Sequence, residues 1–400
     1  MTTALTLTAP GRLADTDRGS YRLETVSTLD AMGDNELHPL TAGRTFYVSR
    51  PWLKAVELQR DDRTAYVTCR DGAGILRGVC PVYWDEPGSR GFYDPFGQFL
   101  HRSGAEFNQD DWSPPYLIGS RAAYSCEFLV DTTIEPNQQR DVLALLLDAV
   151  TTHAREVDAA SLSALYLNPR GAAQLRAALA DDQPFYIAGA NAVLDVPWSS
   201  MDEYVNAMGR RSGNIRREMR TFGEQGYTIA EGRLSDWIDV AADLFSRLER
   251  RYGHESSAAD EAAELRTLAA CADDHGHVLA IRDGAEVIGA ALVFVWEGVV
   301  YTRSAGFNYG ATKRAFEYFN LIYEMIRFAI EHGYRRLDMG MATYRAKLAR
   351  GARLEPLWGM SISRTADSPL CNDTFGSWDQ ARRAAVRAAD PAMLESAELP

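Results

Sequence analysis

The chain has 400 residues, of which 46% are hydrophobic, 10% aromatic and 24% charged, and its formal net charge is −13. These proportions exclude disordered, collagen-like and low-complexity classes, and a chain of this length is expected to form two domains. The negative charge disfavours general binding to nucleic acid unless a local basic patch overcomes the repulsion. The longest apolar run, Ile288 to Trp296, is far shorter than the roughly 20 residues that cross a bilayer, so no membrane span is expected.

Localisation and metal chemistry follow from three further features. Residues 1–19 lack the charged start and apolar segment of a secretory signal, so we expect a flexible tail on a cytoplasmic protein. The five cysteines include no CxxC pair, which indicates neither a disulfide framework nor a zinc site. The seven histidines show no HExxH or HxxxH spacing, so no metal is expected.

The first half of the chain predicts alternating strands and helices. Between residues 20 and 60 we expect a strand and a helix, the helix being favoured by Pro51 in its first turn. Two alternating runs, 63–70 and 74–84, predict a hairpin, and a long aromatic loop follows over 86–115. The remaining elements are a strand over 124–130, a helix over 138–157, a strand over 161–167, a short helix over 171–180 and a strand over 184–196.

The second half begins after a linker near residues 197–202. Its expected elements are a basic helix over 202–225, helices over 234–252 and 258–272, a hairpin over 277–302, a strand over 299–306, a helix over 315–332, a strand over 334–340, a short helix from 342, a strand over 355–364 and a weak helix over 377–389. The Asp283-Gly284 pair marks the hairpin turn, and the apolar stripe of residues 315–332 has a helical period.

The two halves share one order of elements with similar spacings between strands. We therefore predict an internal duplication and an α/β fold with mixed sheets. The expected domains are 20–198 and 199–366, followed by a C-terminal helix and tail over 367–400.

The turn between the strand over 299–306 and the helix over 315–332 is a candidate anion site. Its residues of interest are Ser304, Gly306, Asn308, Gly310, Lys313 and Arg314. Free backbone N–H groups and the helix dipole attract an anion at such a turn, and the glycines permit a close approach of a ligand to the backbone. An ordinary strand-to-helix turn with solvated basic side chains explains the same residues.

Several segments together resemble a known family. They are SMDEYVNAMGRRSGNIRREMR at the start of the second half, AGFNYGATKR before the long helix, and YRRLDMGMATYRAKLARG after it. In this order they are similar to the GNAT superfamily, and most to its double-GNAT branch, which includes the Fem peptidyltransferases and the BioF2-like acetyltransferases. The resemblance is clear over about 200–364 and, over 20–196, rests on the order of elements.

The resemblance implies two tandem GNAT-like domains and acyl transfer from a thioester or an ester to an amine. The donor would be acyl-CoA, or alternatively aminoacyl-tRNA, and would lie along Ser304 to Gly306 with its phosphates at Asn308 to Arg314. The Arg/Gln-x-x-Gly-x-Gly/Ala signature of many GNAT enzymes is absent here. The C-terminal domain would bind the donor, and the N-terminal domain would be degenerate and contribute to the acceptor cleft.

Tyr344 and Lys347 share one face of a short helix because they are three residues apart. The resemblance implies that Tyr344 protonates the leaving group and that Lys347 stabilises the oxyanion. A half-buried tyrosine and a surface lysine explain the pair equally simply. For the general base the sequence leaves several options, Asp338, His254 and Glu255, because the acceptor site of GNAT enzymes opens beside their elements. Asp338 could equally be a structural hydrogen-bond acceptor, and His254 a surface residue.

Two further groups are candidates for binding substrate. Five arginines of the basic helix, among them Arg216, could bind phosphates of CoA, of a phosphorylated acceptor or of a tRNA acceptor stem, or could form a solvated face. Four residues of the first half, Tyr93, Asp94, Phe96 and Trp112, could line a cleft for an organic acceptor or form a local aromatic core.

We therefore predict an N-acyltransferase that uses acyl-CoA and a small-molecule amine. An aminoacyl-tRNA-dependent Fem-like transferase is the alternative, and a non-catalytic GNAT-like binding module is a second one.

Overall fold

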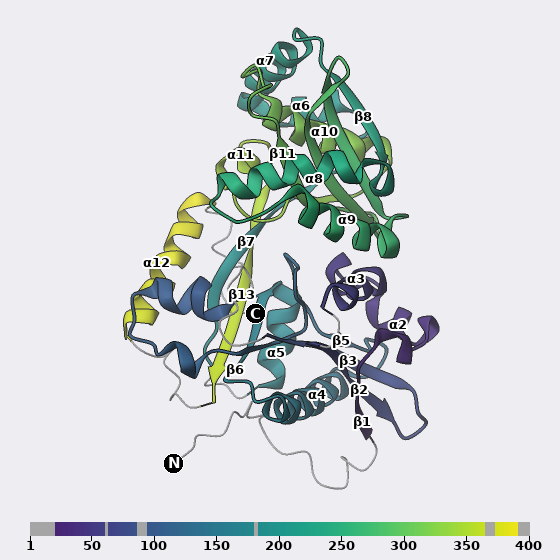
Figure 1. The fold of residues 1–400 in the computed structure, drawn as a ribbon, viewed down its shortest axis with the longest axis vertical. Helices are drawn as coiled ribbons and strands as arrows, with labels where there is room; N and C mark the ends of the chain where they lie inside the picture. The colour runs from purple at the N-terminus through teal and green to yellow at the C-terminus, as the bar shows by residue number, and fades with distance from the viewer. Residues whose placement is uncertain (1–20, 61–62, 86–93, 180–182, 365–372, 391–400) are drawn as a thin grey trace. The chain divides into compact units, whose positions relative to one another are not determined.

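The computed structural model describes residues 21–60, 63–85, 94–179, 183–364 and 373–390 (Figure 1). The chain divides into two compact units: unit 1 comprises Met1–Ala190 and Glu355–Pro400, and unit 2 comprises Asn191–Leu354. These bounds differ from the expected 199–366, because the last strand of the second half belongs to the sheet of unit 1. Tyr93 lies outside the described residues.

Unit 1 is built on a mixed sheet with the strand order β1-β2-β3-β4-β6-β13. The strands are β1 (Tyr21–Val26), β2 (Thr64–Asp71), β3 (Leu76–Trp84), β4 (Pro115–Ile118), β6 (Ser161–Leu167) and β13 (Arg353–Ser363), and β5 (Leu129–Val130) pairs with β3. The helices are α2 (Asp34–Thr41), α3 (Arg50–Arg60), α4 (Pro136–Glu156), α5 (Pro169–Ala178) and α12 (Asp373–Ala389), with short turns η1 (Leu29–Ala31), η2 (Phe46–Val48), η4 (Phe96–Leu100), η5 (His101–Ser103) and η6 (Gln109–Asp111).

The side chains of the β2–β3 hairpin point alternately to its two faces and contribute to two apolar clusters of unit 1. Val67 on β2 and Val82 on β3 belong to a cluster that includes the apolar face of α4. Tyr66 and Val79, each of which directly precedes a member of the first cluster on the same two strands, belong to a second cluster with α2 and α3. Because successive side chains of a strand point to opposite faces, the hairpin predicted from its alternation separates the two clusters.

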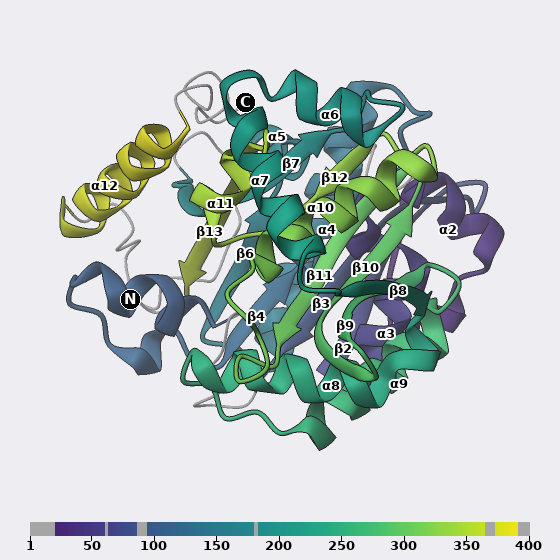
Figure 2. The same ribbon diagram turned by 90° about the horizontal axis from the view of Figure 1, so that it is seen from above.

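Unit 2 has the strand order β7-β12-β11-β10-β9-β8. Its strands are β7 (Tyr186–Asp195), β8 (Thr228–Arg233), β9 (Gly276–Asp283), β10 (Glu286–Trp296), β11 (Val299–Phe307) and β12 (Arg336–Asp338). Its helices are α6 (Met201–Ala207), α7 (Ser212–Gly223), α8 (Leu234–Arg251), α9 (Ala258–Ala272), α10 (Glu317–Glu331) and α11 (Tyr344–Leu348), with a short turn η7 (Gly209–Arg211). Figure 2 shows α8 and α9 on one face of this sheet and α10 on the other.

The order of elements confirms the predicted α/β fold with two similar units. A strand, two helices, a three-stranded meander, a helix, a strand, a short helix and a final strand occur in both halves, starting at β1 and at β8. The final strands are exchanged: β7 of the first half pairs with β12, and β13 of the second half pairs with β6.

Two predictions about single elements were wrong. The expected strand over 124–130 is reduced to β5, and the strand that pairs in parallel with β6 is β4, which begins where the expected loop ends. β4 is therefore the counterpart of β11, which pairs in parallel with β12. Only a four-residue segment forms β4, and its pairing partners rather than its own periodicity make it a strand.

Candidate active site

The sheet of unit 2 opens between β11 and β12. The two strands pair only where Val299–Tyr301 meets Arg336–Asp338. β11 continues to Phe307 beside β10, whereas the chain after β12 stays with β7, because the N–H of Met339 donates to the carbonyl of Ala192 (2.8 Å). Among the described strands, none pairs with this edge of β11 beyond Tyr301. The free edge offers backbone N–H and C=O groups to an extended ligand.

A β-bulge bends β11 at the start of this free edge. Leu292 pairs with Ser304 and Val293 pairs with Thr302, so Arg303 is the extra residue. Its guanidinium donates to the Glu264 carboxylate on α9 (3.2 Å). The predicted donor residue Ser304 follows the bulge directly and is half-buried.

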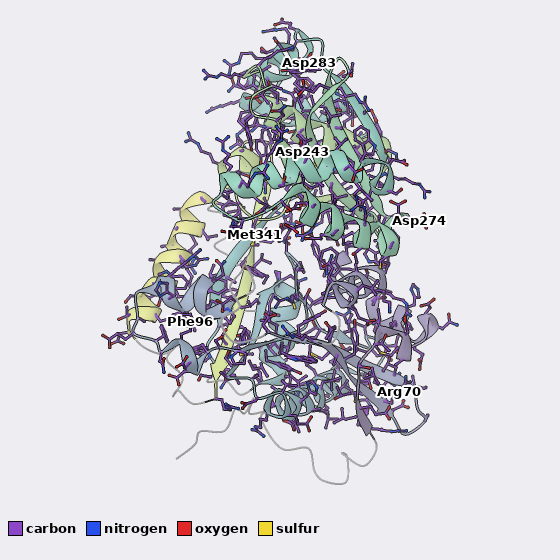
Figure 3. All side chains as sticks on the ribbon, viewed as in Figure 1. Arg70, Phe96, Asp243, Asp274, Asp283 and Met341 are labelled. Carbon is purple, nitrogen blue, oxygen red and sulfur yellow. The ribbon has the colours of Figure 1, made fainter. Side chains whose placement is uncertain are left out.

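Lys347 holds the other wall of the opening. Its Nζ donates to the carbonyl oxygens of Met339 (2.7 Å), Gly340 (3.1 Å) and Met341 (2.8 Å), the last of which is labelled in Figure 3. An ammonium has three N–H donors, so all of them are used. Burial lowers the pKa of Lys347 to about 8, against the opposing effect of the Asp338 carboxylate.

These contacts change the expected role of Lys347. No N–H of the ammonium remains for an oxyanion, so the side chain acts as a clamp on the loop after β12. Asp338, the predicted base, is also engaged: its carboxylate accepts from the N–H of Gly340 (2.9 Å) and from Asn191 (3.3 Å). Both side chains are 6% exposed. The structure thus places them together, as supports of one loop.

Tyr344 lies half-buried on the first turn of α11. The two residues before it, Ala342 and Thr343, have φ values of 62° and 47°, a strained conformation for residues other than glycine. The hydroxyls of Thr343 and Tyr318 are 2.7 Å apart, which links the start of α11 to the first turn of α10. Burial raises the pKa of Tyr318. No sequence pattern pointed to Tyr318, because it lies in what is otherwise an ordinary amphipathic helix.

The turn before α10 differs from a simple anion site. The carboxylate of Glu317 accepts from the backbone N–H of Lys313 (2.7 Å) and from the hydroxyl of Tyr227 (3.1 Å). The ammonium of Lys313 forms an ion pair with Asp283 (2.6 Å), which is labelled in Figure 3. Arg314 is exposed and forms no ion pair within the described residues. One N–H and one cation of the expected phosphate site are therefore already occupied.

The backbone of the same turn is nevertheless strained. Arg314 has a φ of 59° and Phe316 has a φ of 64°, and a positive φ is rare for a bulky residue. Alternation of right- and left-handed residues directs successive N–H groups toward one point and forms an anion-binding nest. The backbone N–H groups of residues 314–316 have no hydrogen-bond acceptor among the described residues.

The two glycines of the turn, Gly306 and Gly310, lie in different surroundings. A Cβ on Gly306 would lie 2.3 Å from the carbonyl oxygen of Leu244, so Gly306 is required by the close packing of α8 on β11. A Cβ on Gly310 would meet only the Asn308 side chain, at 3.5 Å. The amide of Asn308 donates to Glu286 (2.8 Å) and its carbonyl oxygen accepts from two N–H groups of the turn. Packing therefore explains Gly306, whereas the space beside Gly310 is open.

The arginines of α7 and η7 point outward, as predicted from the apolar face of this segment. Tyr204, Ile215 and Phe222 are buried, and the five arginines are exposed. Arg216 donates to the Asn206 side chain (2.6 Å), and the guanidinium of Arg217 lies 5.9 Å from the ring centre of Phe316, at the start of α10. Most of these arginines form no ion pair with a described carboxylate; the exception, Arg220, lies 3.8 Å from Glu224.

The remaining predicted residues have surroundings of their own. His254 is exposed in the loop after α8, with Nε2 4.0 Å from a carboxylate oxygen of Glu249. In unit 1, the carboxylate of Asp94 accepts from the N–H groups of Phe96 (3.1 Å) and Gly97 (3.0 Å) and so caps η4. Trp112 is 1% exposed and packs in the core. Phe96, labelled in Figure 3, is half-buried.

Neither a metal site nor a membrane span is found in the described parts of the chain. No group of three or more His, Cys, Asp or Glu side chains there is arranged to hold a metal ion. No helix there combines the length and the apolar character that a membrane-spanning segment needs.

Comparisons with known proteins agree on the fold. Residues 209–348 match the family model described as an acetyltransferase (GNAT) domain. Among solved structures, FemX is similar at 11% identity and a TM-score of 0.56, over 87% of this chain and 98% of FemX. A conserved protein of unknown function from Bacteroides thetaiotaomicron VPI-5482 is similar at 12% identity and a TM-score of 0.55, over 86% of this chain and 100% of that one. A search of curated proteins gave no match.

A tandem GNAT protein from the clavulanic acid biosynthesis pathway is also similar, at 12% identity and a TM-score of 0.46, over 87% of this chain and 100% of that one. The residues matched to the family model run from η7 to α11 and include the opening between β11 and β12. Residues 209–348 thus match an acetyltransferase (GNAT) domain, and the chain is similar in fold to FemX.

Proposed function

We propose that this chain transfers an acyl group from an activated ester or thioester to the amine of a small molecule, with the reacting carbonyl held between β11 and β12. The observation that carries this proposal is the divergence of these strands after Tyr301 and Asp338. A donor in extended conformation can hydrogen bond to the free edge of β11, as an added strand would. The match of residues 209–348 to an acetyltransferase domain supports the same class of reaction.

The chemistry requires one proton to leave the amine and one to reach the leaving group. The amine attacks the donor carbonyl, the tetrahedral oxyanion collapses, and the thiolate or ribose alkoxide departs with a proton. We assign the second proton to the hydroxyl of Tyr344, and Tyr318 is the other tyrosine near this wall. For the first proton we favour His254 over Asp338, because the carboxylate of Asp338 already accepts two hydrogen bonds.

Of the two expected donors, two observations favour aminoacyl-tRNA. The carboxylate of Glu317 lies at the turn where the diphosphate of CoA would be bound, and a negative charge there repels it. The exposed arginines of η7 and α7, of which Arg220 alone pairs with a described carboxylate, offer an extended basic face. Such a face suits a nucleic-acid backbone better than a single small ligand. The net charge does not oppose this choice, since basic and acidic residues are nearly equal in number in unit 2.

Acyl-CoA is the second candidate donor. The strained turn at Arg314 and Phe316 favours it, because free N–H groups in a nest bind a single phosphate well. Arg217 adds a positive charge beside the same turn.

Binding measurements on the purified full chain test the proposal and separate the donors. We expect an aminoacyl-tRNA mixture to bind with a steep salt dependence, and Arg217→Gln to weaken this binding about tenfold. Arg220→Gln is the matched control on the same helix, because Arg220 is partly neutralised by Glu224. Binding of acetyl-CoA alone, with a shallow salt dependence, would favour the second donor. If neither donor binds, the proposed reaction is wrong and a non-catalytic binding module is favoured.

A further inference from the structure

A buried ion pair joins α7 to the chain that follows α11. The guanidinium of Arg350 donates to the Glu218 carboxylate (2.6 Å), and the two side chains are 4% and 11% exposed. The hydroxyl of Tyr323 on α10 donates to the same carboxylate oxygen (2.5 Å). The guanidinium also lies over the ring of Phe319, 3.7 Å from its centre. Glu218, which the sequence shows as the one acid among the arginines, is thus a buried partner and not part of the basic face.

The same arginine is bound to α11 on its other side. Arg350 donates to the carbonyl oxygen of Ala346 (2.8 Å), and its own carbonyl oxygen accepts from the hydroxyl of Tyr204 on α6 (3.1 Å). Arg211 donates to the carbonyl oxygen of Leu348 (2.5 Å). Residues of α6, η7 and α7 therefore hold the C-terminal end of α11 and the chain that follows it.

These contacts place α7 in touch with both walls of the opening. Through Arg217 and Phe316 it reaches the turn before α10. Through Glu218 and Arg350 it reaches α11, which carries Lys347 and hence the loop at residues 339–341. The outward face of α7 carries the exposed arginines, so one helix presents the basic surface on one side and the buried pair on the other.

We propose that Glu218 and Arg350 are positioning residues that couple the basic face of α7 to the loop over residues 339–343. A polyanion bound to the arginines holds α7 in one position. The buried pair extends this positional constraint to α11 and to the carbonyls that accept hydrogen bonds from Lys347. The identity of the polyanion rests on the proposed function, but the coupling itself does not. A buried ion pair gives little net stability compared with apolar packing, and a role in fixing one arrangement accounts for its presence.

Hydrogen exchange of backbone amides in the full chain tests the coupling without any ligand. Arg350→Met removes the pair, and Arg44→Met is the matched control, because Arg44 forms an equally buried pair with Glu127 (3.1 Å) in unit 1. We expect Arg350→Met to speed exchange over residues 339–343 at least about tenfold, and Arg44→Met to leave it unchanged. Equal effects of both variants, or no effect of Arg350→Met, would overturn the proposal.

Two conservative variants keep the test decisive if Arg350→Met does not fold. Glu218→Gln retains an acceptor for Tyr323 but removes the charge, and Arg350→Lys retains the charge but not the contact with the Ala346 carbonyl. Both should speed exchange over residues 339–343 by less than Arg350→Met. If both behave as the native chain does, the pair has no positioning role.

Uncharged tRNA at low salt supplies the second arm of the experiment. We expect it to slow exchange in α7 of the native chain and of Arg350→Met, but to slow exchange over residues 339–343 in the native chain alone. Slowing of that loop in Arg350→Met as well would contradict the coupling. If tRNA slows nothing in the native chain, the proposed donor fails, whereas the ligand-free comparison still decides the positioning role.

Discussion

Replacing Lys347 by methionine separates two roles of this residue, holding the loop and acting on the substrate. Methionine has a similar length but no N–H, so the carbonyls of Met339, Gly340 and Met341 lose their common donor. If the ammonium is a clamp, the loop should leave its position and acyl transfer should fall by about 100-fold, the usual cost of misplacing a site by about 1 Å.

The free energy of unfolding should change much less, because two effects of the substitution oppose each other. Gly340 keeps the N–H of Ala192 as a donor (3.1 Å), and Met341 is half-exposed, so only the buried carbonyl of Met339 is left unpaired. That costs about 1–3 kcal/mol. Against this, the pKa of Lys347 is lowered from 10.5 to about 8, so the substitution relieves a burial penalty of about 3 kcal/mol at pH 7. We expect a net change below about 2 kcal/mol.

The difference between the native chain and Lys347→Met should depend on pH in a defined direction. The pKa of Lys347 is lower in the folded chain than in the unfolded chain, so the unfolded chain binds the proton more tightly. From this group alone, the native chain gains stability relative to the variant as pH rises from about 8 to 10.5, by up to about 3 kcal/mol, and shows no such change below pH 8.

Three measurements check this reasoning. Urea unfolding at pH 7 and pH 10 gives the two free energies, exchange of the Gly340 amide reports the loop, and transfer of a labelled acyl group reports activity. A loss of stability above about 4 kcal/mol at pH 7, or full activity in Lys347→Met, would refute the clamp. Lost activity with unchanged exchange at Gly340 would instead show that Lys347 acts on the substrate.

Three further substitutions are expected to have distinct effects. Gly306→Ala should lower the melting temperature and cost about 1–3 kcal/mol, because its Cβ meets the backbone of α8, whereas the control Gly310→Ala should be neutral within about 0.5 kcal/mol. Tyr344→Phe should lower kcat about 100-fold with little change in KM, and an equal loss in Tyr318→Phe alone would move the acid role there. Glu317→Gln should raise the affinity for CoA several-fold by calorimetry; unchanged affinity would show that its charge does not exclude a diphosphate.

The order of the elements was predictable because each element follows from a local sequence pattern. The hairpin of β2 and β3 follows from alternation around a short turn, and the long helix α10 follows from its apolar stripe. β4 was missed because four residues carry too little periodicity, and the strand that pairs with them in parallel lies more than forty residues later. The exchange of β7 and β13 was also missed, since the register between distant strands leaves no local trace.

The elements that carry the candidate site were predictable, but the contacts of their side chains were not. Tyr-x-x-Lys on a short helix located α11 correctly, yet a sequence cannot show that the ammonium of Lys347 is buried and fully hydrogen bonded. The sequence of the turn before α10 indicates a basic site at Lys313, whereas the carboxylate of Glu317 also lies at this turn. The burial and the partners of charged side chains depend on tertiary structure, so the same residues are compatible with an exposed face and with a buried network.

Backbone strain gives an independent reason to locate function at the opening between β11 and β12. Half of the described non-glycine residues with positive φ lie on the two loops beside it: Arg314, Phe316, Ala342 and Thr343. Each such conformation costs on the order of 1–3 kcal/mol and persists only where surrounding contacts impose it. Buried charged groups hold the neighbouring residues of both loops: Glu317 accepts from the N–H of Lys313, and Lys347 donates to the carbonyl oxygen of Gly340. Simple connections would not need such supports, so we infer that the two loops are held in shape for a ligand.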